Sequence, residues 1–200
     1  MTIINSLPLP TLTSAQEHFY KTIQGGFNFE DVYTQMVSVA SPNSVFVEIG
    51  AWKGKSSSFM AVEIANSKKN IKFYCVDTWK GSQNEMCHLT DPDIVKHGSI
   101  LNVFTQNTKP VAKFIDAIQM PSTVAPRLFD DKSLDFVFID ADHSYEAVKA
   151  DIAAWHPKVK QGGYLGGHDL CFETVKRAVD EMIGSNYTVM SDGWCWLIRL

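Results

Sequence analysis

Short apolar runs alternate with longer segments of helical periodicity along most of the chain. The runs are expected to be buried strands, mostly parallel, at 45–49, 71–77, 114–119, 134–139 and 164–167. Helices are expected at 29–39, 56–65, 93–105, 145–155 and 173–183, and another near Thr13, where Ser14 and Glu17 have capping-box spacing. Two last strands, 187–190 and 194–199, flank the hairpin signal Ser191-Asp192-Gly193.

Strands that alternate with helices predict an α/β fold with a doubly wound, mostly parallel sheet. The terminal hairpin would add one antiparallel strand to that sheet. Residues 1–43 are expected to form an N-terminal helical cap, and residues 44–200 the main domain. Ligands of such sheets bind beyond the carboxyl ends of the strands, so the site is expected just after Val47, Val76, Ile118, Ile139 and Gly166.

The composition narrows the classes of function. The chain has 200 residues and a net charge of -4, which gives no basic surface for nucleic acid or an anionic membrane. No apolar run reaches the roughly 18 residues that a membrane helix needs. The first basic residue is Lys21, and the four cysteines form no C-x-x-C pair. We therefore expect free thiols and a cytoplasmic location, with no membrane and no nucleic acid as partner.

The loop after the first strand, residues 48–56, reads EIGAWKGKS. A P-loop needs one more residue between Gly50 and Gly54, and a dinucleotide fingerprint needs glycine where Trp52 stands. The pattern acidic-x-G-x-x-x-G fits without a gap and suits S-adenosylmethionine, which has no phosphate to hold. Asp77, at the end of the second strand, can accept ribose hydroxyls. An ordinary strand-to-helix turn is the alternative for this loop.

Carboxylates and imidazoles gather after the fourth and fifth strands. Asp140, Asp142 and His143 follow the fourth strand, and His168 and Asp169 follow the fifth. Adjacent parallel strands would bring these groups together, where carboxylates repel unless a cation or a proton lies between them. A hard divalent ion, most simply Mg²⁺, would resolve the conflict.

These motifs resemble class I S-adenosylmethionine-dependent methyltransferases, and most closely the macrocin O-methyltransferase and cephalosporin-hydroxylase-like group, of the methyltransferase domain 24 type. The resemblance covers roughly residues 44–169. The motifs that carry it are Glu48-x-Gly50-x-x-x-Gly54-x-Ser56, Phe138-Ile139-Asp140-x-Asp142-His143-Ser144-Tyr145, Asp151, and Gly162-Gly163 to Gly167-His168-Asp169. It implies a Rossmann-like, seven-stranded sheet. The cofactor-binding residues that it implies are Glu48, Gly50, Gly54, Ser56, Asp77, Ser122 and Asp140.

The resemblance also implies a mechanism. Asp140, His168 and Asp169 would hold a metal ion, which this family implies to be Mg²⁺. His143 would be the base. His168 stands where an acidic or amide ligand is expected, and imidazole is a less apt ligand for Mg²⁺. The implied reaction is methyl transfer from S-adenosylmethionine to a hydroxyl of a small molecule or sugar, with proton removal by an imidazole of ordinary pKa near 6.5.

Two other classes of function stay open. One is a non-catalytic nucleotide-binding or scaffold protein of the same fold. The other is a different enzyme, such as an NAD-dependent oxidoreductase, or one with iron bound by His143, Asp140 and His168. The segment 79–108 and the N-terminal helices are expected to shape the acceptor pocket, and a homodimer through them is plausible.

For some residues the sequence predicts a structural role rather than a catalytic one. Asp142 is expected to cap the helix that follows it, and Asp151 to lie on a solvated helix face. Solvent exposure is expected for His88 and His97. Core or interface positions are expected for Trp155, Trp194 and Trp196.

Overall fold

A seven-stranded sheet forms the centre of the computed structural model, which describes residues 15–82, 85–191 and 193–200. The strand order is β3-β2-β1-β4-β5-β7-β6. The strands are β1 (Val45–Ile49), β2 (Lys72–Asp77), β3 (Asp116–Gln119), β4 (Leu134–Ile139), β5 (Val159–Gly167), β6 (Thr188–Val189) and β7 (Trp196–Arg199). The pairs from β3 to β5 are parallel, and β7 is antiparallel to both of its neighbours. The predicted doubly wound sheet with one antiparallel strand is confirmed.

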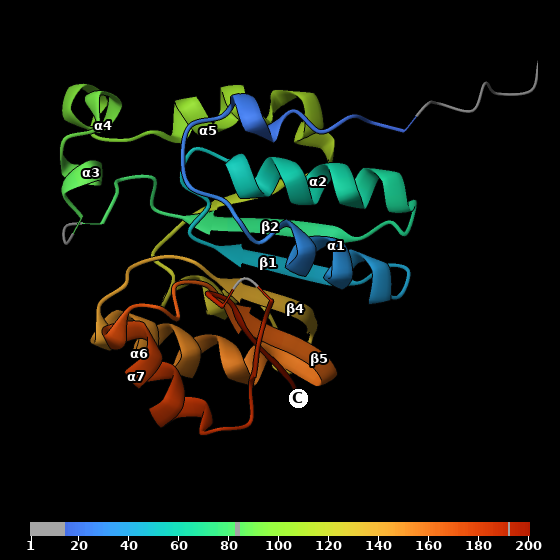
Figure 1. The fold of residues 1–200 in the computed structure, drawn as a ribbon. Coiled ribbons are helices and arrows are strands. Elements are labelled where there is room, and N and C mark those ends of the chain that lie inside the picture. The colour runs from blue at the N-terminus through green and yellow to red at the C-terminus, as the bar shows by residue number, and fades with distance from the viewer. Residues whose placement is uncertain (1–14, 83–84, 192) are drawn as a thin grey trace, which may run out of the picture.

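Helices cover both faces of the sheet (Figure 1). One face packs against α1 (Glu30–Val39) and α2 (Lys55–Ser67), with α5 (Leu101–Thr108) beside α2, and the other against α6 (Tyr145–Trp155) and α7 (Glu173–Ile183). The inner strands are apolar on both sides for this reason: Phe46 of β1 faces α1 and α2, and Val47 faces the other layer. The shorter elements are η1 (Tyr20–Thr22), α3 (Met86–Leu89), α4 (Pro92–His97), η2 (Lys109–Phe114), η3 (Ala125–Leu128) and η4 (His156–Lys158).

Two predicted helices differ from the structure. Thr13 and Ser14 lie outside the described residues, and residues 15–19 are not helical, so the first helical turn in the described part of the chain is η1. The predicted helix 93–105 is two helices, because Gly98 has a left-handed φ of 69° that ends α4. Within the predicted hairpin β6 and β7 do pair, although Asp192 of its turn lies outside the described residues.

The N-terminal segment contributes to the main core. The side chains of Tyr33 and Met36 on α1 are buried in the same cluster as Phe46 and Phe138 of the sheet. A domain division at residue 43 stays a prediction. None of the helices in the described part of the chain is long and apolar enough to cross a lipid bilayer.

The parallel strands end at a common edge. Figure 1 shows α3 and α4 at the left, on the side to which the arrowheads of β1 and β2 point. The loops after β1, β2, β4 and β5 lie at this edge, where they line shared cavities.

Candidate active site

The loop between β1 and α2 requires glycine at two positions for reasons of packing. Gly50 has a φ of 91°, and a Cβ there would lie 1.8 Å from the backbone oxygen of Asp140. Gly54 has a φ of 85°, and its Cβ would lie 2.7 Å from Thr108 Cγ2. The loop can thus pass directly beside the end of β4 and beneath α5.

Glu48 supports this loop from behind. Its carboxylate accepts hydrogen bonds from the Tyr33 hydroxyl at 2.8 Å, from Ser57 Oγ, and from Cys75 Sγ at 3.4 Å. Burial raises the pKa of Glu48, against the opposite effect of these donors and of Ser56. Among the described residues, those that line the two cavities below do not include Glu48 or Gly54, whereas Ser56 lines the second cavity. In this arrangement Glu48 orders the loop and the start of α2.

Asp77 joins the loops after β1 and β2. Its Oδ2 accepts the backbone N–H of Trp52 at 2.8 Å, and its Oδ1 accepts that of Trp79 at 2.7 Å. Burial raises the pKa of Asp77, and these two hydrogen bonds oppose the effect. Each carboxylate oxygen has a further lone pair, so the group can still accept a hydroxyl from a ligand.

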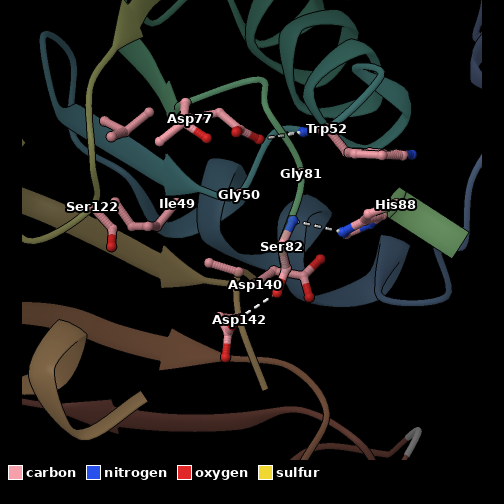
Figure 2. Close-up of a pocket in the computed structure, with 13 residues that line it drawn as sticks. Ile49, Gly50, Trp52, Asp77, Gly81, Ser82, His88, Ser122, Asp140 and Asp142 are labelled. Carbon is pink, nitrogen blue, oxygen red and sulfur yellow. Dashed lines mark hydrogen bonds between the residues drawn. The ribbon is translucent and has the colours of Figure 1, made fainter. Parts of the chain in front are cut away.

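A cavity of about 340 Å³ lies over the ends of β1, β2 and β4 (Figure 2). This size is adequate for a nucleoside-sized ligand. Four of the predicted cofactor residues line it: Gly50, Asp77, Ser122 and Asp140. The lining residues that were not predicted to bind the cofactor are Ile49, Trp52, Val76, Thr78, Gly81, Ser82, His88, Ala141 and Asp142.

Trp52 and His88 form a stacked wall on one side of this cavity. Their ring centroids are 3.8 Å apart, with an interplanar angle of 29°. His88 Nδ1 accepts the backbone N–H of Ser82 at 3.0 Å, and burial lowers the pKa of His88. The ring is therefore neutral, with its proton on Nε2. The predicted exposure of His88 is wrong: the side chain is partly buried, and no spacing in the sequence marks it.

A second cavity, of about 440 Å³, lies beyond this wall. It shares Gly50, Trp52, His88, Asp140 and Ala141 with the first cavity. Its other lining residues come from the loop 24–29, the loop after β1 and the start of α2, the segment before α3, the loops after β4 and β5 and the loop before β7. They include Phe29, Lys53, Lys55, Ser56, Glu85, His143, His168, Asp169 and Trp194.

The predicted cluster of carboxylates and imidazoles lies at the floor of this second cavity. His143 Nε2 is 2.7 Å from Asp169 Oδ2, and His143 Nδ1 is 2.5 Å from Glu85 Oε1. His168 Nδ1 is 3.2 Å from Asp169 Oδ1 and 3.7 Å from Asp140 Oδ1. The structure brings together four of the five residues that the sequence placed here, and it adds Glu85 from the segment before α3. The fifth, Asp142, instead accepts hydrogen bonds from Ser82 and Ser144.

The charges of the cluster are strongly coupled. Hydrogen bonding to Asp169 raises the pKa of His143 to about 9, so this ring is protonated at neutral pH. Burial would raise the pKa of Asp169, but the hydrogen bonds from His143 and His168 outweigh it and hold that pKa well below its usual value. Burial raises the pKa of Asp140 to about 7 despite the nearby His168.

The donor atoms suit a divalent cation that accepts both oxygen and nitrogen ligands. Asp140, His143 and Asp169 each offer a ligand atom, and these atoms lie within 4.8 Å of one another. Mg²⁺ prefers oxygen ligands throughout, whereas Mn²⁺ and later ions accept imidazole more readily. The donor set therefore fits Mn²⁺ better than Mg²⁺.

A second group, Glu85, Cys87 and His88, also has donor atoms within 4.8 Å of one another. The hydrogen bond from Ser82 to His88 Nδ1 leaves the ring proton on Nε2, so the nitrogen facing this group has no lone pair to offer. This second group does not suit a metal.

Other predictions have mixed outcomes. Asp142 was predicted to cap α6, but the N-cap residue is Ser144, whose side chain makes no capping hydrogen bond; Asp142 Oδ1 instead accepts the backbone N–H of Ser144 at 2.8 Å, in the turn before the helix. Asp151 is only 2% exposed, so its predicted place on a solvated face is wrong. Trp155 and Trp196 are buried as predicted, whereas Trp194 is 41% exposed and stacks on His168.

A doubly wound sheet with one reversed strand, an acidic-x-G-x-x-x-G loop after its first strand and a carboxylate at the end of its second define a class I methyltransferase. A family model described as a methyltransferase domain matches residues 47–170, which is more than half of the chain. The chain belongs to this family of S-adenosylmethionine-dependent methyltransferases.

Individual relatives are distant. An uncharacterized protein, y4gI, from Sinorhizobium fredii is 24% identical over 155 residues, which are 78% of this chain but only 16% of that protein. The O-methyltransferase NovP is similar in structure, with a TM-score of 0.64 and 16% identity over 86% of this chain and 78% of NovP. CalS11, a TDP-rhamnose 3'-O-methyltransferase of calicheamicin biosynthesis, has a TM-score of 0.56 and 14% identity over 86% of this chain and 76% of its own. At these identities the structural likeness establishes the fold.

Proposed function

We propose that the protein transfers a methyl group from S-adenosylmethionine to a hydroxyl of a small molecule. The observation that carries this proposal is the pair of adjoining cavities. The first has Asp77 and Ser122 on its walls, the second has the acid–imidazole cluster, and Asp140 lies where they meet. A methyl donor and an acceptor on either side would face each other across that junction.

The first cavity is assigned to the cofactor. Asp77 has lone pairs for the ribose hydroxyls, Ser122 offers a hydroxyl, and Gly50 allows close approach of the backbone. The wall of Trp52 and His88 offers aromatic faces to an apolar or cationic group. When bound, S-adenosylmethionine supplies a methyl carbon made electrophilic by its sulfonium.

His143 is assigned to proton removal from the acceptor hydroxyl. A protonated imidazole cannot accept a proton, and the ion pair with Asp169 holds His143 in that form at neutral pH. His143 can serve as the base only after its carboxylate partners bind another group, because the pKa of His143 then falls and the ring loses its own proton. A divalent ion on the carboxylates of Asp140 and Asp169, with His143 left unliganded, would lower the pKa of a bound hydroxyl.

The acceptor is proposed to be a small-molecule hydroxyl, such as that of a sugar. The names of NovP and CalS11 support O-methylation, and that of CalS11 supports a sugar. The chain's net charge of -4 argues against nucleic acid. The proposal includes a cytoplasmic location and a homodimer.

Calorimetric titration tests the proposal. We expect S-adenosylmethionine to bind with micromolar affinity while NAD does not, and radiolabelled methyl to reach a hydroxyl in a panel of sugars and phenols when Mn²⁺ is added. Binding without transfer to any acceptor would favour the scaffold alternative. Binding of NAD instead would favour an oxidoreductase, and no binding by folded protein would reject the methyltransferase.

A further inference from the structure

A third cavity, of about 520 Å³, lies at the opposite edge of the sheet from the proposed reaction. Its lining residues come from the end of α1 and from the places where β1, β4 and β5 begin. Arg199 at the end of β7 also lines it, because β7 runs antiparallel to β5 and pairs Arg199 with Tyr164. Among the described residues, none lines both this cavity and either of the other two. The third cavity is therefore separate from the proposed methyl-transfer site.

A bulge at the start of β5 forms one wall of this cavity. The register between β4 and β5 shifts after Leu134, so residues 160–163 of β5 have no partner on β4. Gly162 in the bulge has a left-handed φ of 81°, which suits glycine. An added Cβ there would meet only Arg199 Nη2 within 4 Å, at 3.9 Å. The bulge thus places polar groups and the Arg199 guanidinium around one space instead of in a regular ladder.

The charged residues that line the cavity leave one cation in surplus. Lys160 Nζ lies 2.5 Å from Asp135 Oδ1, and Asp135 Oδ2 accepts the backbone N–H of Val45 at 2.8 Å. Both oxygens of Asp135 therefore have partners. Arg199 Nε donates to the backbone oxygen of Gly162 at 3.3 Å, and its guanidinium forms no ion pair with a carboxylate of the described residues. Its Nη atoms can still donate to a ligand.

The other polar groups of the cavity suit a ligand that carries hydroxyls. The Tyr164 ring lies beside Arg199, with its centroid 5.7 Å from Arg199 Cζ. The Gln161 amide and the Tyr164 hydroxyl form no hydrogen bond with another residue of the described chain. Both groups can donate to and accept from a hydroxyl. The planar N–H groups of arginine match the two oxygens of a carboxylate.

We infer that the third cavity is a binding site for a small hydroxylated carboxylate, such as a sugar acid. The carboxylate pairs with Arg199, and the hydroxyls bond to Gln161 and Tyr164. One surplus positive charge matches a single carboxylate better than a doubly charged phosphate, and the volume of about 520 Å³ is sufficient for a ligand of this size. The site does not depend on the proposed methyl transfer.

Calorimetric titration with gluconate tests the site, with uncharged glucose as the control ligand. Gluconate should bind with a dissociation constant of about 1 mM, and glucose at least about tenfold more weakly. Arg199→Gln should weaken gluconate binding at least about tenfold, and Arg199→Lys, which keeps the charge but not the planar donors, about threefold. Arg127→Gln removes an exposed arginine outside the three cavities, and as the matched control it should bind like the wild type.

Two further variants test the hydroxyl contacts. Gln161→Ala and Tyr164→Phe should each weaken gluconate binding at least about twofold. Neither should change the binding of propionate, which has a carboxylate and no hydroxyl. Gln161 is exposed and Tyr164→Phe changes only one oxygen, so both variants should fold. If both bind gluconate like the wild type, the cavity does not recognise hydroxyls and the inference is overturned.

Backbone amide shifts in NMR spectra locate the bound gluconate. The shifts should concentrate at Gly162 and Gly163, while Gly50 and Asp169 stay unchanged. Shifts at Gly50 and Asp169 instead would place gluconate in the proposed reaction site and overturn the inference. Equal affinity of the wild type and Arg199→Gln would also overturn it, as would inorganic phosphate that binds at Gly162 as tightly as gluconate. None of these results bears on whether the protein binds S-adenosylmethionine.

Discussion

Gly50 permits the closest backbone approach in the site, since a Cβ there would meet the Asp140 carbonyl oxygen at 1.8 Å. We expect Gly50→Ala to lower the free energy of unfolding by about 3 kcal/mol, because the loop and the end of β4 must separate. Gly98→Ala is the control: its φ of 69° is also left-handed, but nothing lies within 4 Å of the added carbon. It should cost only about 1 kcal/mol. Urea unfolding measures both, and equal losses would contradict this account.

Carboxylates, chiefly Asp169, raise the pKa of His143 and so keep its imidazole protonated. Its raised pKa of about 9 means that the ion pair is intact at neutral pH and is lost as the pH rises through that value. In Asp169→Asn the pKa of His143 should fall by at least about one unit toward the ordinary 6.5. An NMR titration of the imidazole measures it, with Asp130→Asn, at an exposed site, as control. A His143 pKa that stays near 9 in Asp169→Asn would reject Asp169 as the cause.

Single residues differed in how far the sequence revealed them. The meeting of Asp140, His143, His168 and Asp169 was predictable because each follows one of two adjacent parallel strands. Glu85 belongs to a segment outside the sheet, so the register of the strands does not predict its position. The hydrogen bonds of Glu48 to residues on α1 and α2 depend on tertiary packing, which a loop motif does not contain.

Among the elements, α4 is tied to the glycine loop by a buried ion pair. Lys53 Nζ lies 2.6 Å from Asp91 Oδ2, and their side chains are 5% and 9% exposed. Asp91→Asn should keep the cap of α4, because asparagine is an equally good N-cap, while it leaves the Lys53 charge without its partner. We expect a loss of about 3 kcal/mol in the free energy of unfolding, measured in urea.

The control for this pair is Asp180→Asn, which breaks the exposed pair of Lys176 and Asp180 on α7. Water screens that pair, so its loss should not change the unfolding midpoint detectably. If the two variants unfold alike, the Lys53–Asp91 pair does not anchor α4.

The elements themselves were predictable where apolar periodicity was strong. The strand at 134–139 and the helices at 145–155 and 173–183 have the predicted bounds, because burial on one or both faces leaves a clear pattern. The segment 93–105 was less clear: its pattern is helical on both sides of Gly98, and the break depends on a single left-handed residue.

At the scale of the whole molecule, the doubly wound, mostly parallel sheet followed from the alternation of strands and helices. The two cavities did not. They depend on how the segment after β2 folds back over the sheet edge and places His88 on Trp52, and such long-range packing leaves no periodic trace in the sequence.

The wall of Trp52 and His88 has a consequence for the order of events in catalysis. If the methyl donor and the acceptor occupy the two adjoining cavities together, as proposed, the reaction should pass through a ternary complex. Initial-rate lines at varied concentrations of both substrates should then intersect, and S-adenosylhomocysteine should compete with the methyl donor but not with the acceptor. Parallel lines would instead indicate that the methyl group rests on the protein between two separate half-reactions.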